Sequence, residues 1–264
     1  MMPLSRRKCL RLLGAGAGAL VLGPRLGWAE KIKTMKTRPK AVVLDVIETC
    51  FAIDPLGEKL KALGLRDGSL KIWFPRVLRD AFALQVTGTY KPFGEIATGT
   101  LGALLAENDL EADPAKMKEV IQAFATLPVH PDVKEGIAIL RDAGIRVAAL
   151  TNGSAETTRK MFANAGLETA IEKFISIEEV KQWKPAAAVY LHAAKSLGVK
   201  PEELALVAAH DWDIDGAGRA GLTTGYVARK QPRGSAAMRP PDVSGGSLPE
   251  VARALLALGA AASR

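Results

Sequence analysis

The feature that most constrains the fold of this chain is a series of short apolar runs that end in polar, chemically capable residues. The first run, residues 41–44, is rich in β-branched side chains and ends at Asp45. Later runs end at Thr151-Asn152 and just before Asp211. Continuous apolar segments of this length favour central strands of a parallel sheet, which is buried on both faces.

Predicted strands and helices alternate in the second half of the chain. The expected strands cover residues 145–150, 174–177, 204–209 and 224–228, and the expected helices cover 132–143, 154–165, 185–197, 214–220 and 249–258. This alternation predicts an α/β fold with a doubly wound, Rossmann-like parallel sheet. Residues 229–247 are rich in Pro, Gly and Ser, which predicts a long surface loop.

A helical insertion is expected after the first strand. Apolar residues recur at three- and four-residue spacing in four segments, residues 59–65, 70–86, 93–107 and 114–127. We therefore predict a small helical domain over residues 54–127, inserted into a core formed by residues 30–53 and 128–264.

The N-terminal 29 residues have the pattern of an export signal. A basic start that contains Arg6 and Arg7 precedes a Gly/Ala-rich apolar run over residues 12–23, and Gly27-Trp28-Ala29 offers small residues for cleavage. The apolar run is short for a membrane span, which needs about 20 residues. The paired arginines resemble a twin-arginine signal, so we expect export by that machinery and a periplasmic or exported protein. An uncleaved anchor or a misplaced start is the alternative.

The net charge of the chain argues against a nucleic-acid partner. The formal charge is +8, but residues 1–29 contain five basic residues and no acidic one, so the rest of the chain carries +3. No basic stripe interleaved with aromatic residues is present. Cys50 would be the one cysteine left after cleavage, and a buried structural thiol is favoured over a catalytic one because no histidine is close to it in sequence.

Four polar groups are expected at one edge of the sheet. Asp45, Thr151-Asn152 and Asp213 each follow a predicted strand, and Lys184 opens the helix after another. Since right-handed crossovers place the carboxyl ends of parallel strands at one edge, these groups should converge at one crevice. An acid, a hydroxyl, an amide and an ammonium would then meet in one site.

This set of motifs resembles the haloacid dehalogenase superfamily, in particular its type II 2-haloacid dehalogenases. The resemblance covers roughly residues 38–228. The motifs that carry it are Asp45 with Thr49, Leu150-Thr151-Asn152-Gly153, Lys184-Pro185 with Tyr190, and Ala208-Ala209-His210-Asp211-Trp212-Asp213. The helical insertion matches the cap domain of that group.

The resemblance implies a role for each matched residue. Asp45 would be the nucleophile that expels the halide, and Lys184 would keep it ionised. Asp213 would position or activate the water that hydrolyses the aspartyl ester. The remaining residues would bind the substrate or line its pocket, namely Thr49, Thr151, Asn152, Tyr190, Phe74 and His210. The resemblance also implies a homodimer, because relatives commonly dimerise.

Two departures from the superfamily disfavour a phosphatase. Its phosphatases carry a second aspartate two residues after the nucleophile, where this chain has Ile47, and a magnesium-binding aspartate where it has Ala209. Asp45 and Asp213 alone make a poor site for a hard divalent cation, which takes several oxygen ligands. We therefore expect no metal and no cofactor.

A further departure concerns the leaving group. Type II enzymes place a halide-binding arginine on the cap, and the residue at about that place here is Phe74. Arg76 and Arg79 are close in sequence but match the motif only after a shift. His210 stands where better-known members have asparagine, so it could orient water, donate to the leaving group, or lie behind the site.

Each of these residues also has a structural interpretation. Asp45 and Asp213 could cap helices, Lys184 could be a solvated loop residue, Thr151-Asn152 could form a turn, and Phe74, Tyr190 and Trp212 could be packing residues. Taken together, the motifs predict a metal-independent hydrolase of small 2-haloalkanoic acids that acts on a small carboxylate substrate. The alternatives are a small-molecule phosphatase of the same superfamily and an exported binding protein that has lost turnover.

Overall fold

The computed structural model describes residues 36–259, and the expected export signal over residues 1–29 lies outside them. Six parallel strands form one sheet in the order β3-β2-β1-β4-β5-β6. Their bounds are β1 Ala41–Leu44, β2 Arg146–Thr151, β3 Phe174–Ser176, β4 Leu204–Ala208, β5 Thr223–Val227 and β6 Val243–Gly245. The predicted doubly wound parallel sheet is confirmed, and β1 to β5 are almost wholly buried, as their apolar sequences require.

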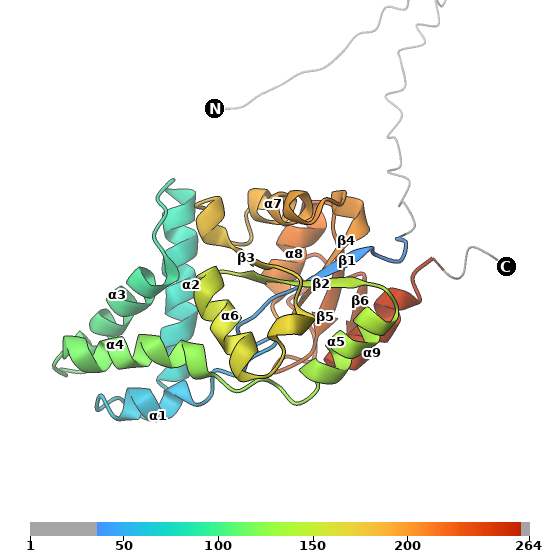
Figure 1. The fold of residues 1–264 in the computed structure, drawn as a ribbon. Coiled ribbons are helices and arrows are strands. Elements are labelled where there is room, and N and C mark those ends of the chain that lie inside the picture. Colours follow the sequence, from blue (N-terminus) through green and yellow to red (C-terminus); the bar gives the residue numbers. More distant parts are fainter. Residues whose placement is uncertain (1–35, 260–264) are drawn as a thin grey trace, which may run out of the picture. The chain divides into compact units, whose positions relative to one another are not determined.

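The helices of the core cover both faces of the sheet (Figure 1). They are α5 Val133–Asp142, α6 Ala155–Asn164, α7 Ala187–Leu197, α8 Asp211–Arg219 and α9 Leu248–Leu256. The chain runs from β1 outward to β3 and then crosses back to β4, so right-handed crossovers place α5 and α6 on one face and α7 and α8 on the other. The order reverses between β1 and β4, which is where doubly wound sheets open a crevice for ligands.

The prediction of a long loop over residues 229–247 is wrong for its last part. Val243–Gly245 forms β6, which pairs in parallel with β5 at the edge of the sheet. This strand has three half-buried or exposed residues and includes a glycine. It therefore lacks both the apolar run and the alternation by which a strand is predicted from sequence.

The segment between β1 and α5 is helical, as the sequence predicts. It contains α1 Leu56–Lys61, α2 Leu70–Val86, α3 Phe93–Ala106 and α4 Pro114–Gln122, followed by a 3₁₀ turn over Ala123–Thr126. Trp73 is fully buried among these helices, and its indole N–H bonds the carbonyl of Ala97 and the hydroxyl of Thr100, each at 3.1 Å. The boundaries proposed at residues 54 and 127 stay a prediction, since all described residues belong to one unit.

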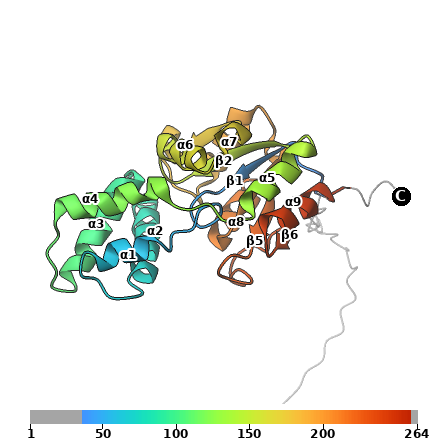
Figure 2. The same cartoon turned by 60° about the horizontal axis from the view of Figure 1, so that its bottom comes forward.

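The inserted helices contact the core beside the carboxyl edge of the sheet (Figure 2). The Trp183 backbone N–H donates to the Gln85 side chain and its indole N–H donates to the Lys91 carbonyl, both at 3.0 Å. Phe82 packs edge-on against Trp212 with ring centroids 5.3 Å apart. Within residues 36–259, no helix is both long enough and apolar enough to cross a membrane.

A glycine in α5 permits close packing of α5 against α9. A Cβ atom added to Gly136 would lie 2.5 Å from Cγ of Leu248. We predict that Gly136→Ala lowers the free energy of unfolding by about 1–3 kcal/mol, as overpacking does. Adding Leu248→Ala removes the contacts with Cγ and Cδ2 but leaves Cβ 2.9 Å away, so it should relieve the clash only in part. The measurement is urea denaturation.

The matched control for this prediction is Gly99→Ala. Gly99 is exposed within α3, and a Cβ atom there meets nothing within 4 Å. This variant should gain up to about 1 kcal/mol from helix propensity. An equal gain at Gly136 would show that α5 and α9 are not in tight contact.

Candidate active site

A tight loop after β1 folds back over Asp45. The amides of Cys50 and Phe51 both bond the Val46 carbonyl, at 2.9 and 3.0 Å. The loop thereby brings the Thr49 hydroxyl to Asp45, where it donates to Oδ2 at 2.6 Å. The same hydroxyl accepts the Ala209 N–H at 2.8 Å, so Thr49 is fixed between β1 and β4. The Asp45 carboxylate is thus held in one orientation.

The loop is anchored from outside by Arg229, which directly follows β5. Its guanidinium donates to the Thr49 carbonyl at 2.9 and 3.1 Å and pairs with Asp132 at 2.8 Å. Sequence reasoning missed this residue, because nothing in the sequence of a surface loop relates it to Thr49.

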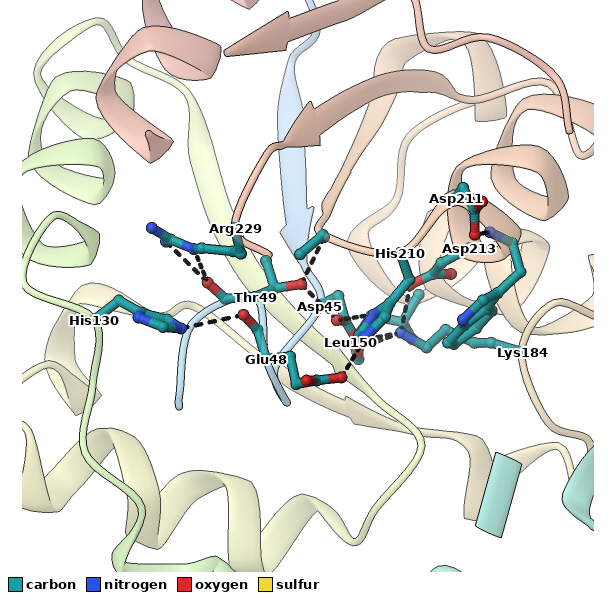
Figure 3. A network of polar contacts seen from close by, with 12 residues as sticks. Asp45, Glu48, Thr49, His130, Leu150, Lys184, His210, Asp211, Asp213 and Arg229 are labelled. Atoms are coloured by element: carbon teal, nitrogen blue, oxygen red, sulfur yellow. Dashed lines mark hydrogen bonds and ion pairs between the residues drawn. The ribbon is translucent and has the colours of Figure 1, made fainter. Parts of the chain in front are cut away.

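Lys184 is the central charge of the site (Figure 3). Its side chain is fully buried, and Nζ lies 2.6 Å from Oδ1 of Asp45, 2.7 Å from Oδ2 of Asp213 and 3.3 Å from the Leu150 carbonyl. Burial alone would lower the pKa of Lys184, but the two carboxylates outweigh it and raise that pKa. Burial likewise opposes ionisation of Asp45, yet the charge of Lys184 and the hydrogen bond from His210 bring its pKa below the ordinary value. Asp45 is therefore an ionised carboxylate.

Asp213 lies behind Lys184 and does not line the cavity. One carboxylate oxygen bonds Lys184, and the other accepts the Tyr190 hydroxyl at 2.5 Å. Asp213 and Tyr190 are both fully buried, and burial and the neighbouring Asp213 raise the pKa of the Tyr190 hydroxyl, which stays a donor. Both residues hold Lys184 in place. Their expected roles, water activation for Asp213 and pocket lining for Tyr190, stay predictions without a contact that supports them.

His210 and Glu48 form a second charged pair beside Asp45. The sequence predicted a role for His210 but not for Glu48. His210 Nδ1 lies 3.1 Å from Oδ2 of Asp45, and Nε2 lies 3.1 Å from Oε2 of Glu48. Glu48 also pairs with Lys230 at 3.2 Å. Burial opposes the charged imidazolium, but the two carboxylates outweigh it and raise the pKa of His210 to about 10. The position of Glu48 between Asp45 and Thr49 was the one sequence feature that could have indicated its place in the site.

The cavity beside Asp45 is small and largely apolar, with a volume of about 230 Å³. Its apolar wall comes from both the inserted helices and the core and includes Phe74, Leu78, Phe93, Ile121, Phe124, Met161, Trp183 and Trp212. Its polar wall includes Asp45, Thr151, Asn152, Ser154 and His210. Such a cavity suits a small substrate with an apolar body and one polar end.

The polar end of the cavity is the N-terminus of α6. Ser154 caps this helix by accepting the Thr157 N–H, and helix N-termini attract carboxylates. Thr151 and Asn152 line the cavity but also support the turn. The Thr151 hydroxyl accepts the Gly153 N–H at 2.9 Å, and the Asn152 side chain accepts the Lys184 N–H at 3.1 Å.

The cap arginines do not reach the site. Arg76 pairs with Glu107 at 2.7 Å and Arg79 with Asp80 at 2.8 Å, and neither lines the cavity. Phe74 does line it and packs against Phe124 with ring centroids 6.5 Å apart. Cys50 is fully buried, and burial raises the pKa of its thiol, which fits a structural role.

Comparison with known proteins assigns the family. The model of the haloacid dehalogenase-like hydrolases matches residues 37–221. The chain belongs to this family of hydrolases. It is 30% identical to (S)-2-haloacid dehalogenase 1 of Pseudomonas sp. strain CBS-3 over 158 residues, which are 60% of this chain and 70% of the relative. It is 28% identical to the (S)-2-haloacid dehalogenase of Xanthobacter autotrophicus over 192 residues, which are 72% and 75% of the two chains.

A solved structure shows the same fold. The L-2-haloacid dehalogenase of Xanthobacter autotrophicus, with chloropropionic acid covalently bound, superposes with a TM-score of 0.76 at 24% identity. The match covers 81% of this chain and 97% of that one. The expected membership and fold class are therefore confirmed.

The burial of Lys184 leads to a prediction about the stability of the folded protein. Lys184→Met would leave the buried Asp213 carboxylate without a counter-charge and Asp45 with His210 alone, and an uncompensated buried charge typically costs about 3–5 kcal/mol. Lys184 lowers the pKa of Asp45 in the folded protein. The stabilisation of the folded state by this ion pair is therefore fully present above the ordinary aspartate pKa near 4 and is lost as the pH falls. The deficit of the variant, measured by denaturation at several pH values, should shrink on acidification.

Lys160→Met is the matched control. Lys160 pairs with Glu156 at 2.7 Å on the surface of α6, with both side chains more than half exposed. Its loss should cost about 1 kcal/mol or less. Equal effects of the two substitutions would contradict the buried-charge interpretation.

Proposed function

We propose that this protein is a hydrolytic dehalogenase of small 2-haloalkanoic acids with Asp45 as its nucleophile. The observation that carries the proposal is the ionised Asp45 carboxylate, bonded to the buried ammonium of Lys184 and facing a small, mostly apolar cavity. A carboxylate in such a place is a nucleophile for covalent catalysis. The names of the relatives support the same reaction, since they are 2-haloacid dehalogenases.

The geometry supports a separate binding place for each end of the substrate. The substrate carboxylate would bind at the N-terminus of α6, beside Thr151 and Asn152. An Asp45 oxygen would attack the carbon that bears the halogen, the carbon–halogen bond would break, and halide would leave into the apolar part of the cavity. The product of this step is an ester of Asp45, which accords with the covalently bound chloropropionic acid of the structural relative.

The phosphatase alternative fits the site poorly. Ile47 carries no acidic proton where the phosphatases have their second aspartate. The four carboxylate oxygens of Asp45 and Asp213 already bond Lys184, Thr49, His210 and Tyr190. A divalent cation takes about six oxygen ligands, and Ala209 supplies no side-chain oxygen. The residues present therefore do not form a magnesium site.

Halide release tests the proposal directly. The wild-type protein should release halide from 2-chloro- and 2-bromopropionate at the same rate with and without a chelator. Asp45→Asn should lower that rate by about a thousandfold or more, because the covalent route is lost. With enzyme in excess in ¹⁸O-water, the first turnover should give an unlabelled hydroxy acid and leave label in Asp45.

The outcomes of this experiment separate the three candidate functions. No halide from a panel of chloro, bromo and fluoro acids would refute the dehalogenase. Chelator-sensitive hydrolysis of a phosphate ester would revive the phosphatase. Binding of a haloacid without any product would favour the binding protein.

We also propose that the protein is exported by the twin-arginine machinery. The support is the sequence of residues 1–29, with Arg6-Arg7 ahead of a short apolar run. The full chain should fractionate with the periplasm, and replacing both arginines with lysine should leave it in the cytoplasm. Equal fractionation of the two forms would contradict this proposal. The homodimer also remains a proposal that rests on the resemblance, and sedimentation equilibrium measures it.

A further inference from the structure

Hydrolysis of the Asp45 ester needs a group that takes a proton from water. Asp213 is poorly placed for this, because its side chain is fully buried and does not line the cavity. Lys184 is an ammonium between two carboxylates and has no free lone pair. A general base must lie within hydrogen-bond reach of the water, so the base has to come from another residue.

Glu48 and His210 have the geometry of such a base. His210 lines the cavity together with Asp45, and one of its ring nitrogens lies 3.1 Å from Oδ2 of the nucleophile. The other nitrogen lies 3.1 Å from Glu48, which fixes the ring from behind. The ring stacks on Trp212 with centroids 5.0 Å apart and an interplanar angle of 25°. Asp45, His210 and Glu48 thus form a chain of polar contacts (Figure 3), and Asp45 and His210 line the cavity.

The backbone holds Glu48 in this chain. Its φ angle is +63°, a left-handed conformation that residues other than glycine seldom adopt. The Glu48 carbonyl contacts His130 Nε2 at 3.2 Å, and its N–H donates to the Phe51 carbonyl at 2.8 Å. Strain of this kind persists where the surroundings over-determine it, commonly at functional sites.

The position of His210 does not suit a halide receptor. In an in-line displacement, the leaving group departs from the side of the carbon opposite the attacking oxygen. A ring nitrogen that contacts Asp45 directly is on the attacking side. On that side it can reach the water that later attacks Cγ of Asp45.

We propose that Glu48 and His210 form the general-base dyad of the hydrolytic half-reaction, with His210 as the catalytic base and Glu48 as its positioning residue. This inference rests on the proposed function and deepens it. His210 touches the reacting carboxylate, whereas Glu48 acts through His210.

The proton and electron count of the cycle balances. Attack by Asp45 converts its carboxylate to an ester and releases halide. Imidazolium His210 then loses its proton to solvent, which is the net proton of the reaction. Neutral His210 takes a proton from water as the water oxygen bonds to Asp45 Cγ. The tetrahedral species collapses, the bond from Cγ to the substrate oxygen breaks, and the departing alkoxide takes the proton from His210. The remaining water proton passes from the Asp45 carboxyl to His210, which restores the starting pair.

The charge change at Asp45 couples the two half-reactions. In the free enzyme two carboxylates, Asp45 and Glu48, face the imidazole and keep it protonated. Esterification removes the charge of Asp45, while Lys184 stays on the far side of Asp45 and Lys230 stays on Glu48. The ring therefore holds its proton less strongly when the ester is present than before. Alkylation of Asp45 thus promotes loss of the imidazolium proton of His210.

The decisive experiment separates ester formation from ester hydrolysis. The full-length wild type, His210→Ala and Glu48→Gln are mixed rapidly with 2-bromopropionate. Bromide is followed with time, and the denatured protein is weighed by mass spectrometry. We expect wild type to turn over without a lasting adduct. His210→Ala should release about one bromide per protein, keep the adduct on the Asp45 peptide and lose steady-state turnover by about a hundredfold or more. Glu48→Gln should show the same burst with a smaller loss.

A matched control is available on α7. His192 Nε2 lies 2.9 Å from Glu179 in a histidine–glutamate pair outside the site, so His192→Ala should turn over like wild type. Circular dichroism and the burst itself show that each variant is folded.

The other outcomes overturn the inference in distinct ways. Full turnover by His210→Ala would remove the base role and leave the proposed function intact. Loss of the burst together with the adduct would assign His210 to alkylation. A wild-type hydrolysis rate that falls rather than rises with pH would make His210 a hydrogen-bond donor to the ester carbonyl. A wild type that releases no bromide refutes the proposed function and the dyad together.

Discussion

The site depends on the burial of one ammonium between two carboxylates. Lys184 joins Asp45, which follows β1, to Asp213 in the first turn of α8. Each of the three groups would be costly to bury alone, because charge removed from water must be paired. Removing the ammonium would leave two carboxylates that repel each other. The same contact therefore positions the nucleophile, keeps it ionised and ties α8 to the carboxyl edge of the sheet.

The topology of the sheet explains why these groups meet. Asp45 and His210 follow the adjacent strands β1 and β4, which flank the point where the strand order reverses. The connections leave this point in opposite directions, so no crossover helix covers it. The inserted helices cover that opening and supply part of the apolar wall of the cavity, including Phe74, while Met161, Trp183 and Trp212 of the core supply the rest. The polar groups thus follow the strands of the sheet, and both parts of the chain exclude water.

The sequence was sufficient for the core of the fold and for the groups that contact the nucleophile. Strand runs such as residues 41–44 and the residues just after them are local signals, so Asp45, Lys184 and their shared edge could be predicted. The half-exposed β6 and the anchor Arg229 could not, because they depend on pairing with distant segments. Glu48 was missed for a similar reason. It lies next to Thr49 in sequence, yet its partner His210 is brought to it only by the pairing of β1 with β4.

The same contacts show how the chemistry of this site is distributed. Among the described residues that line the cavity, His210 alone can carry a positive charge, and it is bonded on the side of the nucleophile. Where the proposed mechanism releases halide, the apolar wall includes Phe74, in the place expected for an arginine. The positive edges of aromatic rings attract an anion weakly compared with a guanidinium. Electrostatic help is thus concentrated on the nucleophile and its ester. Among haloacids, this favours substrates whose halogen is already a good leaving group.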